Sequence, residues 1–436
     1  MQMPVAVILA GGVNSRFWPL REKSLLWFCG ESLLARQVRL FAAAGVTNCM
    51  VVGNPANSRL LKEGMIAAGR GDIPIVEQPD ARGMGDALLQ ARPVLRERFP
   101  GRPVLICQVH DVTEASLITS LLRAGDGNAA GWLVGQEVHR YFPGGYLGLD
   151  GERITGIVEK PVPGSEPSNV VNLVMHLFAD AEMLCNAVAD VYAGDIGTTH
   201  DDHYERGLTT LIKHERLEVV RYGGRWQPIK YPWHVLDVGE MLLRHIDAPR
   251  IADDARVADG AGIEGNVVVE RGVRLLAGAR VVGPAYIGAG STICNNALVR
   301  DAIIGPHCVI GYNTDVARSY IGGGTWFHKN YVGDSVIGDG TKFGAGTITG
   351  NLKMSDRTVR SMVKGELIDT GRDKLGVICG KRARTGINVS LMPGVKVGER
   401  SGVGPGVVLL DDLPDDTRVI LKQELTYQRR PIRGEG

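Results

Sequence analysis

The sequence lacks the features of a secreted, membrane-bound or nucleic-acid-binding protein. Its seven cysteines are odd in number and form no CxxC pair, so neither a disulfide framework nor a zinc ribbon is indicated. No apolar run reaches about 18 residues, and the short apolar start has no basic flank, which excludes a membrane span and a signal peptide. The formal net charge is only +1, which gives no electrostatic footprint for nucleic acid or membranes. We therefore expect a cytoplasmic protein with neither kind of partner.

Glycine is the residue type in excess. The 58 glycines among 436 residues are about twice the usual share of about 7%, and they concentrate in the second half. Hydrophobic residues make up 44% and charged residues 22% of the chain, as in an ordinary globular protein with a real core. A chain of this length is expected to form two or three domains.

Strand and helix patterns alternate in the first half. Short apolar runs at 5–9, 49–52, 73–76 and 104–107 are typical of buried strands, and helical patterns lie between them, as at 32–44 and 85–98. This alternation predicts an α/β, Rossmann-like domain with a mostly parallel sheet. Ligands of such sheets bind at the carboxyl ends of the strands. We therefore expect the chemistry in the loops after Leu9, Glu77 and Gln108.

From about residue 250 a different period appears. Aliphatic residues recur at every sixth position, and after a one-residue slip the rhythm returns, as in Ile251, Val257, Ile263, Val269, Leu275, Val281, Ile287, Ile293, Val299, Ile304, Ile310, Val316, Leu391, Val397 and Val403. A period of six predicts a left-handed parallel β-helix with three short strands per coil. Glycine often follows the aliphatic residue, where we expect it to permit the turns at the corners. A Gly-rich linker would not hold aliphatic residues at a fixed phase.

Three segments are therefore expected. Residues 1–247 are expected to form the α/β domain, residues 248–410 the β-helix, and residues 411–436 a polar, poorly ordered tail. The break follows a helical pattern that begins at Leu236 and ends before Pro249.

The first strand runs into a loop suited to phosphate. Gly11 and Gly12 follow the apolar run at 5–9, and such a loop exposes backbone N–H groups that can cradle phosphates. The positive side chains of Arg16 and Lys23 follow in the same segment. The loop is not the dinucleotide G-x-G-x-x-G pattern. Gly-rich turns without ligands are common, so this loop alone leaves both interpretations open.

Further motifs follow in order along the first half. Gly12, Ser15, Arg16 and Lys23 have the spacing of a G-x-G-T-R…K signature, and behind them stand Gln78, Gly83, Asp111, Gly145, Glu159-Lys160-Pro161, Asn172 and Tyr231-Pro232-Trp233. Over nearly all of residues 4–240 this ordered series resembles the sugar-1-phosphate nucleotidylyltransferases. The resemblance implies in-line attack of a sugar-1-phosphate oxygen on the α-phosphorus of a nucleoside triphosphate, with release of pyrophosphate.

The resemblance also implies a role for each matched residue. Arg16 would hold the departing phosphates, Lys23 would neutralise phosphate charge, and Asp111 would bind Mg²⁺. Gly12 would belong to the phosphate loop. The base would contact Gln78 and Gly83, and the sugar would contact Gly145, Glu159 and Asn172.

The chain departs from that family in four places. Asn14 stands where the family has its second Gly, Met84 where it has Thr, and Val109-His110 where it has a small pair. Pro228 stands where relatives place a second Asp or Asn for the metal. Proline has no side-chain ligand for Mg²⁺, although one carboxylate with substrate phosphates and waters can hold this ion. A slow or inactive N-terminal domain therefore stays open as an alternative.

A second constellation interrupts the hexapeptide rhythm. His328, Tyr331 and Asn351 lie at this break, and Asn388 follows in a later coil. The stretch is similar to the acetyltransferase half of the bifunctional glucosamine-1-phosphate acetyltransferase/N-acetylglucosamine-1-phosphate uridylyltransferases, especially the archaeal type. The resemblance implies that His328 is the general base, Tyr331 a sugar contact, Asn351 a neighbour of the thioester, and Asn388 part of the coenzyme A groove.

The acyl acceptor stays open, because Lys342 replaces a sugar-binding Asn of that family and Ala317 stands where the family carries Lys. Three hypotheses follow. The first is a bifunctional enzyme that uses a nucleoside triphosphate, a sugar-1-phosphate, Mg²⁺ and acetyl-CoA on the route to UDP-N-acetylglucosamine. The second is a nucleotidyltransferase of other specificity whose β-helix only oligomerises. The third is a protein that has lost its N-terminal activity and only binds or acetylates.

β-helices of this type usually trimerise, so we expect a homotrimer or a multiple of it.

Overall fold

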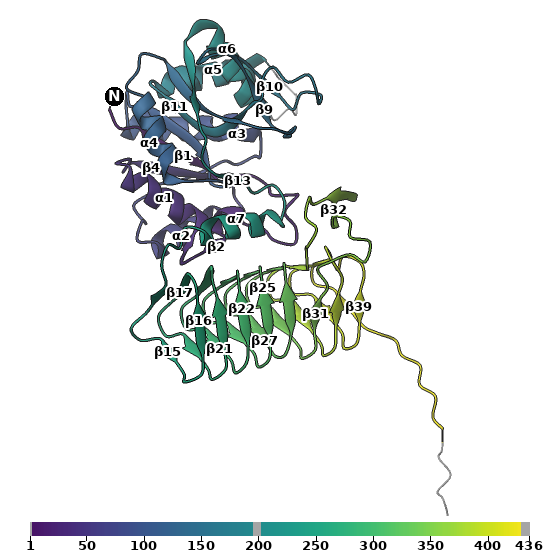
Figure 1. The fold of residues 1–436 in the computed structure, drawn as a ribbon. Coiled ribbons are helices and arrows are strands. Elements are labelled where there is room, and N and C mark those ends of the chain that lie inside the picture. Colours follow the sequence, from purple (N-terminus) through teal and green to yellow (C-terminus); the bar gives the residue numbers. More distant parts are fainter. Residues whose placement is uncertain (1, 195–201, 429–436) are drawn as a thin grey trace, which may run out of the picture. The chain divides into compact units, whose positions relative to one another are not determined.

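The computed structural model of the chain describes residues 2–194 and 202–428. The chain forms two units, Met1–His245 and Ile246–Gly436 (Figure 1). Among the described residues no helix combines the length and the apolar character that crossing a membrane requires.

A nine-stranded mixed sheet is the centre of the first unit. The strands run in the order β5-β4-β1-β6-β11-β8-β12-β10-β9. Their bounds are β1 Val5–Leu9, β4 Cys49–Gly53, β5 Ile75–Glu77, β6 Val104–Gln108, β8 Gly131–Glu137, β9 Gly145–Asp150, β10 Arg153–Glu159, β11 Val170–Phe178 and β12 Leu217–Arg221. Two short pairs lie outside it, namely β2 Trp27–Phe28 with β3 Glu31–Ser32, and β7 Asp111–Thr113 with β13 Trp226–Pro228.

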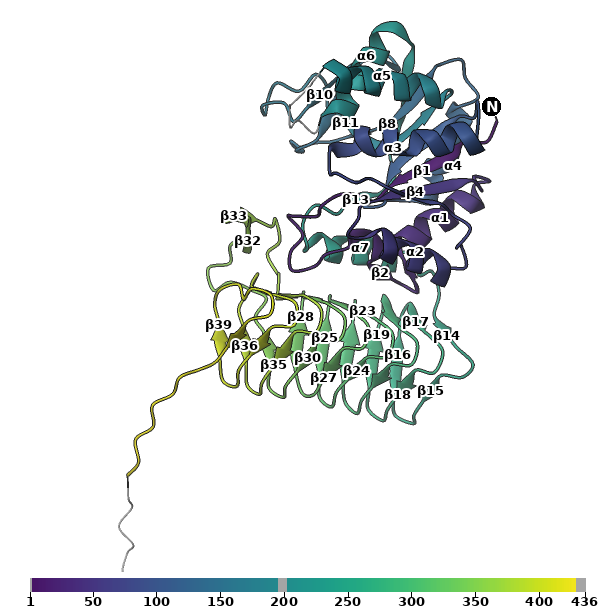
Figure 2. The same ribbon diagram turned by 180° about the vertical axis from the view of Figure 1, so that it is seen from behind.

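Helices cover both faces of this sheet (Figure 2). The helices of this unit are α1 Leu33–Ala43, α2 Ser58–Ala67, α3 Gly83–Arg98, α4 Ala115–Ala124, α5 Ala181–Gly194, α6 His203–His214 and α7 His234–Leu243, with the 3-10 turn η1 Lys23–Leu25, and α7 packs on β13. Helices α3, α5 and α6 share one apolar core with Val5, Val7 and Leu9 of β1. Because alternate side chains of a strand point to opposite faces, Ala6 and Ile8 are buried on the other face.

The prediction of a mostly parallel sheet is wrong for the second half of the sheet. Strands β5, β4, β1 and β6 are parallel, as expected, but β11 runs antiparallel to both β6 and β8. Strands β9 and β10 form a hairpin closed by Gly151 and Glu152. A two-residue connection can only join antiparallel strands.

The second unit is a left-handed parallel β-helix with three flat faces. Face 1 contains β14 Arg250–Ile251, β17 Val267–Val269, β20 Ala285–Ile287, β23 Ile303–Ile304, β26 Tyr320–Ile321, β29 Val336–Ile337, β34 Ile378–Cys379 and β37 Lys396–Val397. Face 2 contains β15 Arg256–Val257, β18 Arg274–Leu275, β21 Thr292–Ile293, β24 Val309–Ile310, β27 Trp326–Phe327, β30 Lys342–Phe343, β35 Arg384–Thr385, β38 Gly402–Val403 and β40 Arg418–Val419. Face 3 contains β16 Gly262–Glu264, β19 Arg280–Val282, β22 Leu298–Arg300, β25 Asp315–Ala317, β28 Tyr331–Gly333, β31 Ile348–Thr349, β36 Ser390–Leu391 and β39 Val408–Leu409.

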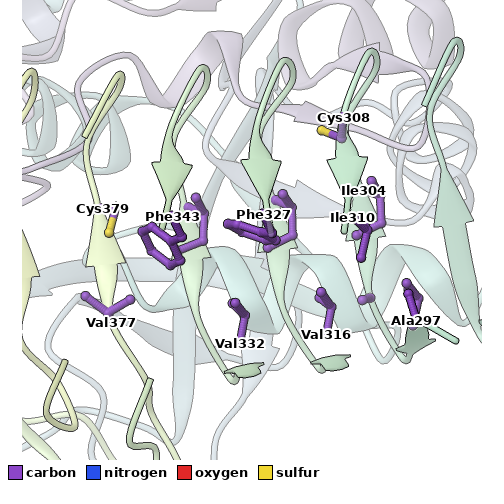
Figure 3. Close-up of a cluster of buried hydrophobic side chains, with 14 of the residues drawn as sticks. Ala297, Ile304, Cys308, Ile310, Val316, Phe327, Val332, Phe343, Val377 and Cys379 are labelled. Atoms are coloured by element: carbon purple, nitrogen blue, oxygen red, sulfur yellow. The ribbon is translucent and has the colours of Figure 1, made fainter. Parts of the chain in front are cut away.

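The in-phase aliphatic residues fill the interior of this prism (Figure 3). Ile304, Ile310 and Val316 belong to one coil and are fully buried. The first coil is the exception, because Ile251 and Val257 are exposed by 48% and 43%. These two side chains stack on a following coil but have none before them.

Glycines next to the aliphatic residues have a different role from the one expected. Gly288 does not have a positive φ, and a Cβ atom there would lie 2.6 Å from the carbonyl carbon of Gly305 in the next coil. Close packing of neighbouring coils therefore excludes a side chain at this position. The left-handed corner conformation falls two residues later, at Gly290 (φ 69°), and likewise at Asn313 (φ 52°), two residues after Gly311 at another corner.

The β-helix is longer than residues 248–410, and one coil carries an insertion. Strand β40 pairs with β38, so regular structure continues to Val419 and the tail begins later than predicted. Residues 429–436 of that tail lie outside the described residues. Between β31 and β34 the hairpin of β32 Arg360–Val363 and β33 Glu366–Asp369 leaves the prism.

Candidate functional site

The first candidate site lies at the carboxyl ends of the parallel strands. Leu9 pairs with both Val52 and Gln108, so the strands end at one edge. Asn54 and Asn57 of the neighbouring loop hold the chain after β1, since their side-chain amides donate to the carbonyls of Gly11 and Ala10, each at 2.9 Å. The loop after β1 is therefore fixed from outside and leaves Gly12 exposed, where a Cβ atom would meet no other atom within 4 Å.

Asn14 has a left-handed backbone conformation, which accounts for the Gly that the resembled family has at this position. Its φ is 53°, in the left-handed region that Asn tolerates better than most residues. The backbone N–H of Phe17 donates to the Asn14 carbonyl and closes the turn. This departure from the family pattern therefore preserves the loop.

Gln78 and Gly83 lie together beside the loop. Nε2 of Gln78 donates to the Gly83 carbonyl at 3.0 Å and to the carboxylate of Asp86 at 2.8 Å. Gln78 is buried, and its Oε1 would lie 2.9 Å from a Cβ atom at Gly11. Glycine at position 11 is therefore needed for this close approach between the two loops.

Charged groups gather at the same edge. Burial, with Arg16 second, lowers the pKa of Lys23 to about 8, while Asp111 opposes the shift. Burial raises the pKa of Asp111 to about 6, against the opposing effects of a hydrogen bond from Trp226 and of Lys230 and Lys23. The structure therefore brings Arg16, Lys23 and Asp111 into one electrostatic cluster.

The position opposite Asp111 bears on metal binding. Strand β13 pairs with β7 so that Pro228 lies directly across from Asp111, and Nε1 of Trp226 donates to the Asp111 carboxylate at 3.0 Å. Within the described residues no group of three or more His, Cys, Asp or Glu side chains could hold a metal ion. Asp111 is thus a single carboxylate, which fits Mg²⁺ only when substrate phosphates and waters complete the shell.

Gly145, Glu159 and Asn172 also converge. Gly145 pairs with Glu159 across β9 and β10, and a Cβ atom at Gly145 would lie 3.0 Å from Oε2 of Glu159 and 3.8 Å from Cβ of Asn172. The absence of a side chain at Gly145 leaves space between the other two residues. The three residues predicted to contact the sugar therefore form one wall.

The second candidate site lies at a shortened corner of the β-helix. Phe327 and Val332 are five residues apart, whereas Ile310 and Val316 at the same corner of the preceding coil are six apart. His328 is exposed at this corner, and its backbone N–H donates to Oδ1 of Asn330 at 2.8 Å. The buried Asn330 amide donates to the carbonyls of Gly344 and Thr347. These side-chain hydrogen bonds hold the corner, which is one residue shorter than that of the preceding coil.

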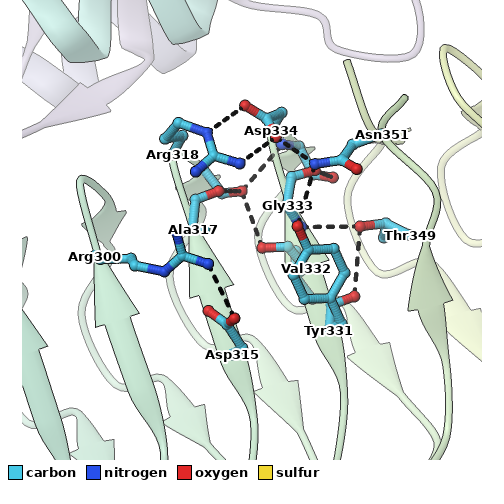
Figure 4. Close-up of polar contacts among 12 residues, drawn as sticks. Arg300, Asp315, Ala317, Arg318, Tyr331, Val332, Gly333, Asp334, Thr349 and Asn351 are labelled. Carbon is cyan, nitrogen blue, oxygen red and sulfur yellow. Dashed lines mark hydrogen bonds and ion pairs between the residues drawn. The ribbon is translucent and has the colours of Figure 1, made fainter. Parts of the chain in front are cut away.

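A polar network follows His328 on face 3 (Figure 4). The amide of Asn351 donates to the Tyr331 hydroxyl at 3.2 Å and to the carboxylate of Asp334 at 2.5 Å. Arg318 binds both oxygens of Asp334 at 2.7 and 2.8 Å. A Cβ atom at Gly333 would lie 2.6 Å from the Tyr331 hydroxyl and 2.8 Å from Nδ2 of Asn351. The network orients both side chains above a glycine, which leaves them room.

Comparison with known proteins agrees with both halves. A family model described as "Nucleotidyl transferase" matches residues 5–226, just over half of the chain. The chain is 30% identical over 426 residues to the "Bifunctional sugar-1-phosphate nucleotidylyltransferase/acetyltransferase" of Sulfurisphaera tokodaii, which covers 94% of this chain and 98% of that protein. The chain belongs to the nucleotidyl transferase family. It is also 30% identical to the "Bifunctional protein GlmU" of Methanococcus vannielii and 28% identical to that of Methanocaldococcus jannaschii, over at least 97% of each chain.

Lys230 belongs to the candidate site of this nucleotidyl transferase, and the sequence analysis missed it. Its Nζ donates to the Pro143 carbonyl at 2.7 Å and lies 4.0 Å from the ring centre of Phe142. Burial lowers its pKa to about 8, and Asp111 and Glu159 oppose that shift. Lys230 therefore joins the charged cluster to the wall with Glu159. The one sequence signal that could have indicated Lys230 is its position directly before the Tyr231-Pro232-Trp233 motif.

The two positions at which the β-helix departs from the acetyltransferase resemblance, Ala317 and Lys342, lie on face 3 and face 2. Ala317 is buried and pairs with Arg300 and Gly333 of the neighbouring coils. Arg300 donates to the carboxylate of Asp315 at 3.1 Å. Lys342 is exposed with its Nζ 5.9 Å from the Trp326 ring centre. Asn388 is exposed at a corner beyond the polar network and has a φ of 54°.

The lysines predict an alkaline limit for nucleotidyl transfer. We expect kcat/KM for the nucleoside triphosphate to fall above about pH 8, by about tenfold per pH unit for each required lysine, because Lys23 and Lys230 then lose their charge. Lys23→Arg should shift the fall in kcat/KM to higher pH, since a guanidinium stays charged. A rate that stays constant to about pH 10 in the pyrophosphate-release assay would contradict this assignment.

Proposed function

We propose that this protein is a bifunctional sugar-phosphate enzyme. The first unit transfers a nucleotidyl group from a nucleoside triphosphate to a sugar-1-phosphate and releases pyrophosphate. The β-helix N-acetylates a sugar phosphate, on the route to a UDP-N-acetylglucosamine-type nucleotide sugar. The observation that carries the proposal is the assembly of Arg16, Lys23 and Asp111 beside the wall formed by Gly145, Glu159 and Asn172.

The cluster suits phosphoryl chemistry because the nucleophile is already an anion. A sugar-1-phosphate oxygen needs no strong base, so positioning and charge neutralisation supply most of the rate. Arg16 and Lys23 would neutralise the phosphates, and the loop at Gly12 would present backbone N–H groups to them. Asp111 would hold Mg²⁺, which when bound stabilises the charge on the transferring and leaving groups.

The corner at His328 suits acyl transfer. Its imidazole would take a proton from the attacking amine as the new C–N bond forms and the C–S bond of the thioester breaks, and the departing thiolate would then be protonated. The exposed ring leaves room for both substrates. Tyr331 and Asn351 are held nearby by Asp334 and Arg318.

A basic pocket supports acetyl-CoA as the acyl donor. A cavity of about 460 Å³ on face 2 is lined by Arg382, Arg384, Arg400 and Arg418 together with Thr385 and Gly386. Arg400 is paired with Asp416, whereas the other three make no ion pair with a described residue. At about 4.8 Å per coil, the pocket lies about 10 to 19 Å along the prism from β27. In acetyl-CoA the pantetheine arm likewise separates the phosphates, which would bind in the basic pocket, from the thioester, which would lie near His328.

A homotrimer remains our proposal for the assembly. Ile348 and Val408 on face 3 are exposed by 50% and 56%, on the same face as Tyr331. Large exposed apolar side chains on a flat face favour association. Light scattering should give three times the chain mass or a multiple of it, and a monomer would argue against an acyl site shared between copies.

The test of the proposed function uses two assays on one preparation. Pyrophosphate release is measured across the nucleoside triphosphates with several sugar-1-phosphates, and thiol release is measured with acetyl-CoA and amino-sugar phosphates. We expect both activities. Thiol release without pyrophosphate release would favour the alternative that Pro228 supports, a lost N-terminal activity. The reverse result would favour a β-helix that only oligomerises, as Ala317 and Lys342 suggest.

The seven free thiols support our proposal of a cytoplasmic, reducing location.

A further inference from the structure

A buried histidine lies behind the wall that holds Asn172. The pairing of β11 with β8 shifts between Leu173, opposite Val134, and His176, opposite Leu133. Two extra residues of β11 are accommodated there. In a regular strand, residues four apart would be separated by about 13 Å, but the bulge brings the side chains of Asn172 and His176 into contact.

Three side chains form a hydrogen-bonded chain at this bulge. Nε2 of His176 lies 2.9 Å from Oδ1 of Asn172, and its Nδ1 lies 2.8 Å from the Tyr204 hydroxyl. His176 and Tyr204 are completely buried, and Asn172 is half-buried. The rings of His176 and Tyr204 are stacked with an interplanar angle of 9°. The three hydrogen-bonded side chains therefore lead from the core outwards to the wall formed by Gly145, Glu159 and Asn172.

The partners determine which nitrogen of His176 carries the proton. Burial lowers the pKa of His176 to about 3, against the opposing effect of a hydrogen bond with the Leu173 backbone carbonyl. The ring is therefore neutral and has one donor and one acceptor. The Tyr204 O–H has no other acceptor among the described residues, and a buried donor without an acceptor is costly. It therefore donates to Nδ1. Nε2 then carries the hydrogen and donates to Asn172.

This arrangement fixes the orientation of the Asn172 carboxamide. Its oxygen is turned towards His176, so its NH₂ group is on the branch that points away from the core. That NH₂ group makes no hydrogen bond to a described residue, and Asn172 lies beside Gly145 and Glu159. We propose that His176 and Tyr204 are positioning residues that hold the Asn172 amide as a hydrogen-bond donor to the sugar-1-phosphate. The proposal rests on the proposed nucleotidyl transfer.

Tyr204→Phe tests the chain with the smallest change, because it removes one hydroxyl and keeps the stacked ring. We expect the KM for N-acetylglucosamine-1-phosphate to rise about tenfold, with kcat and the KM for the nucleoside triphosphate nearly unchanged. In the Asn172→Ala background the same substitution should have no further effect on that KM. Equal effects in the two backgrounds would overturn the proposal, since Tyr204 would then act without Asn172.

Tyr222→Phe is the matched control. The Tyr222 hydroxyl is also in the first unit, donates to the Arg225 carbonyl at 2.9 Å and accepts from the Glu114 N–H at 3.2 Å. Both variants should lower the thermal unfolding midpoint to a similar extent. Only Tyr204→Phe should change the KM for the sugar-1-phosphate. The same rise in both variants would show a general loss of stability and would overturn the positioning role.

A measurement on the ring separates this inference from the proposed function. The ¹⁵N shifts of His176, in protein labelled at histidine, should show the Nε2–H tautomer in the wild type, and loss of one preferred tautomer in Tyr204→Phe. A wild-type Nδ1–H tautomer would overturn the inference. If the wild type releases no pyrophosphate, the proposed function fails. Calorimetric binding of N-acetylglucosamine-1-phosphate to the wild type and Tyr204→Phe would then still decide whether the chain positions Asn172.

Discussion

Asp111→Asn should reduce nucleotidyl transfer by about 10³-fold or more while acetyl transfer continues at the wild-type rate. Asparagine keeps the shape of the side chain and can still accept the hydrogen bond from Trp226. It removes the negative charge that a divalent cation requires and that offsets Lys23 and Lys230. Pro228 on the paired strand supplies no substitute ligand, so we expect no residual metal-dependent rate.

The measurement is pyrophosphate release at increasing Mg²⁺, with thiol release from acetyl-CoA recorded on the same preparation. Glu97→Gln is the charge-matched control, because Glu97 is exposed on α3 of the same unit and should leave both rates unchanged. A variant at Asp111 that retains more than a tenth of the wild-type rate would show that the metal is held elsewhere. The proposed role of the cluster would then be wrong.

His328→Ala should lower acetyl transfer by about 10² to 10⁴-fold, the usual contribution of a general base. The fold should be unaffected, because the contacts that close this corner use the His328 backbone and the side chain of Asn330. The first unit should keep its full rate of pyrophosphate release. Thiol release at saturating acetyl-CoA measures the loss.

Lys329→Ala provides the comparison for His328→Ala. Lys329 is the next exposed residue at the same corner, and its backbone carbonyl, which accepts from the Gly346 N–H, is unaffected by the substitution. We expect it to retain wild-type acetyl transfer. Full activity in His328→Ala would remove the histidine from the mechanism, and equal losses in the two variants would indicate disturbance of the corner.

The β-helix was predictable from the sequence because each coil repeats one rule. An aliphatic residue at a fixed phase has to point inward, and Ile304, Ile310 and Val316 do so. The repeat does not say where the stack begins, so the exposure of Ile251 was not foreseen. The mixed strand order of the first unit was missed for a related reason. Apolar runs reveal strands, but their direction depends on connections and on distant partners.

The candidate sites were predictable only where a short motif carries them. Arg16, Lys23 and Asp111 fall in recognisable segments, and the structure places them in one cluster. Trp226 and Lys230 reach the same cluster from more than a hundred residues further along, through the pairing of β13 with β7. His176 carries no local signal at all. Its contact with Asn172 depends on a bulge that only the partner strand reveals.

The shortened corner at His328 also affects how such a protein can change. The omission of one residue is absorbed within a single layer, and the pairing of face 2 resumes in register at Phe343 with Thr385. Stability in a stack of this kind comes mainly from nearest-neighbour contacts. Natural variation can therefore lengthen or shorten one coil, or change its side chains, so that the protein uses a new acyl acceptor. The neighbouring coils keep their geometry.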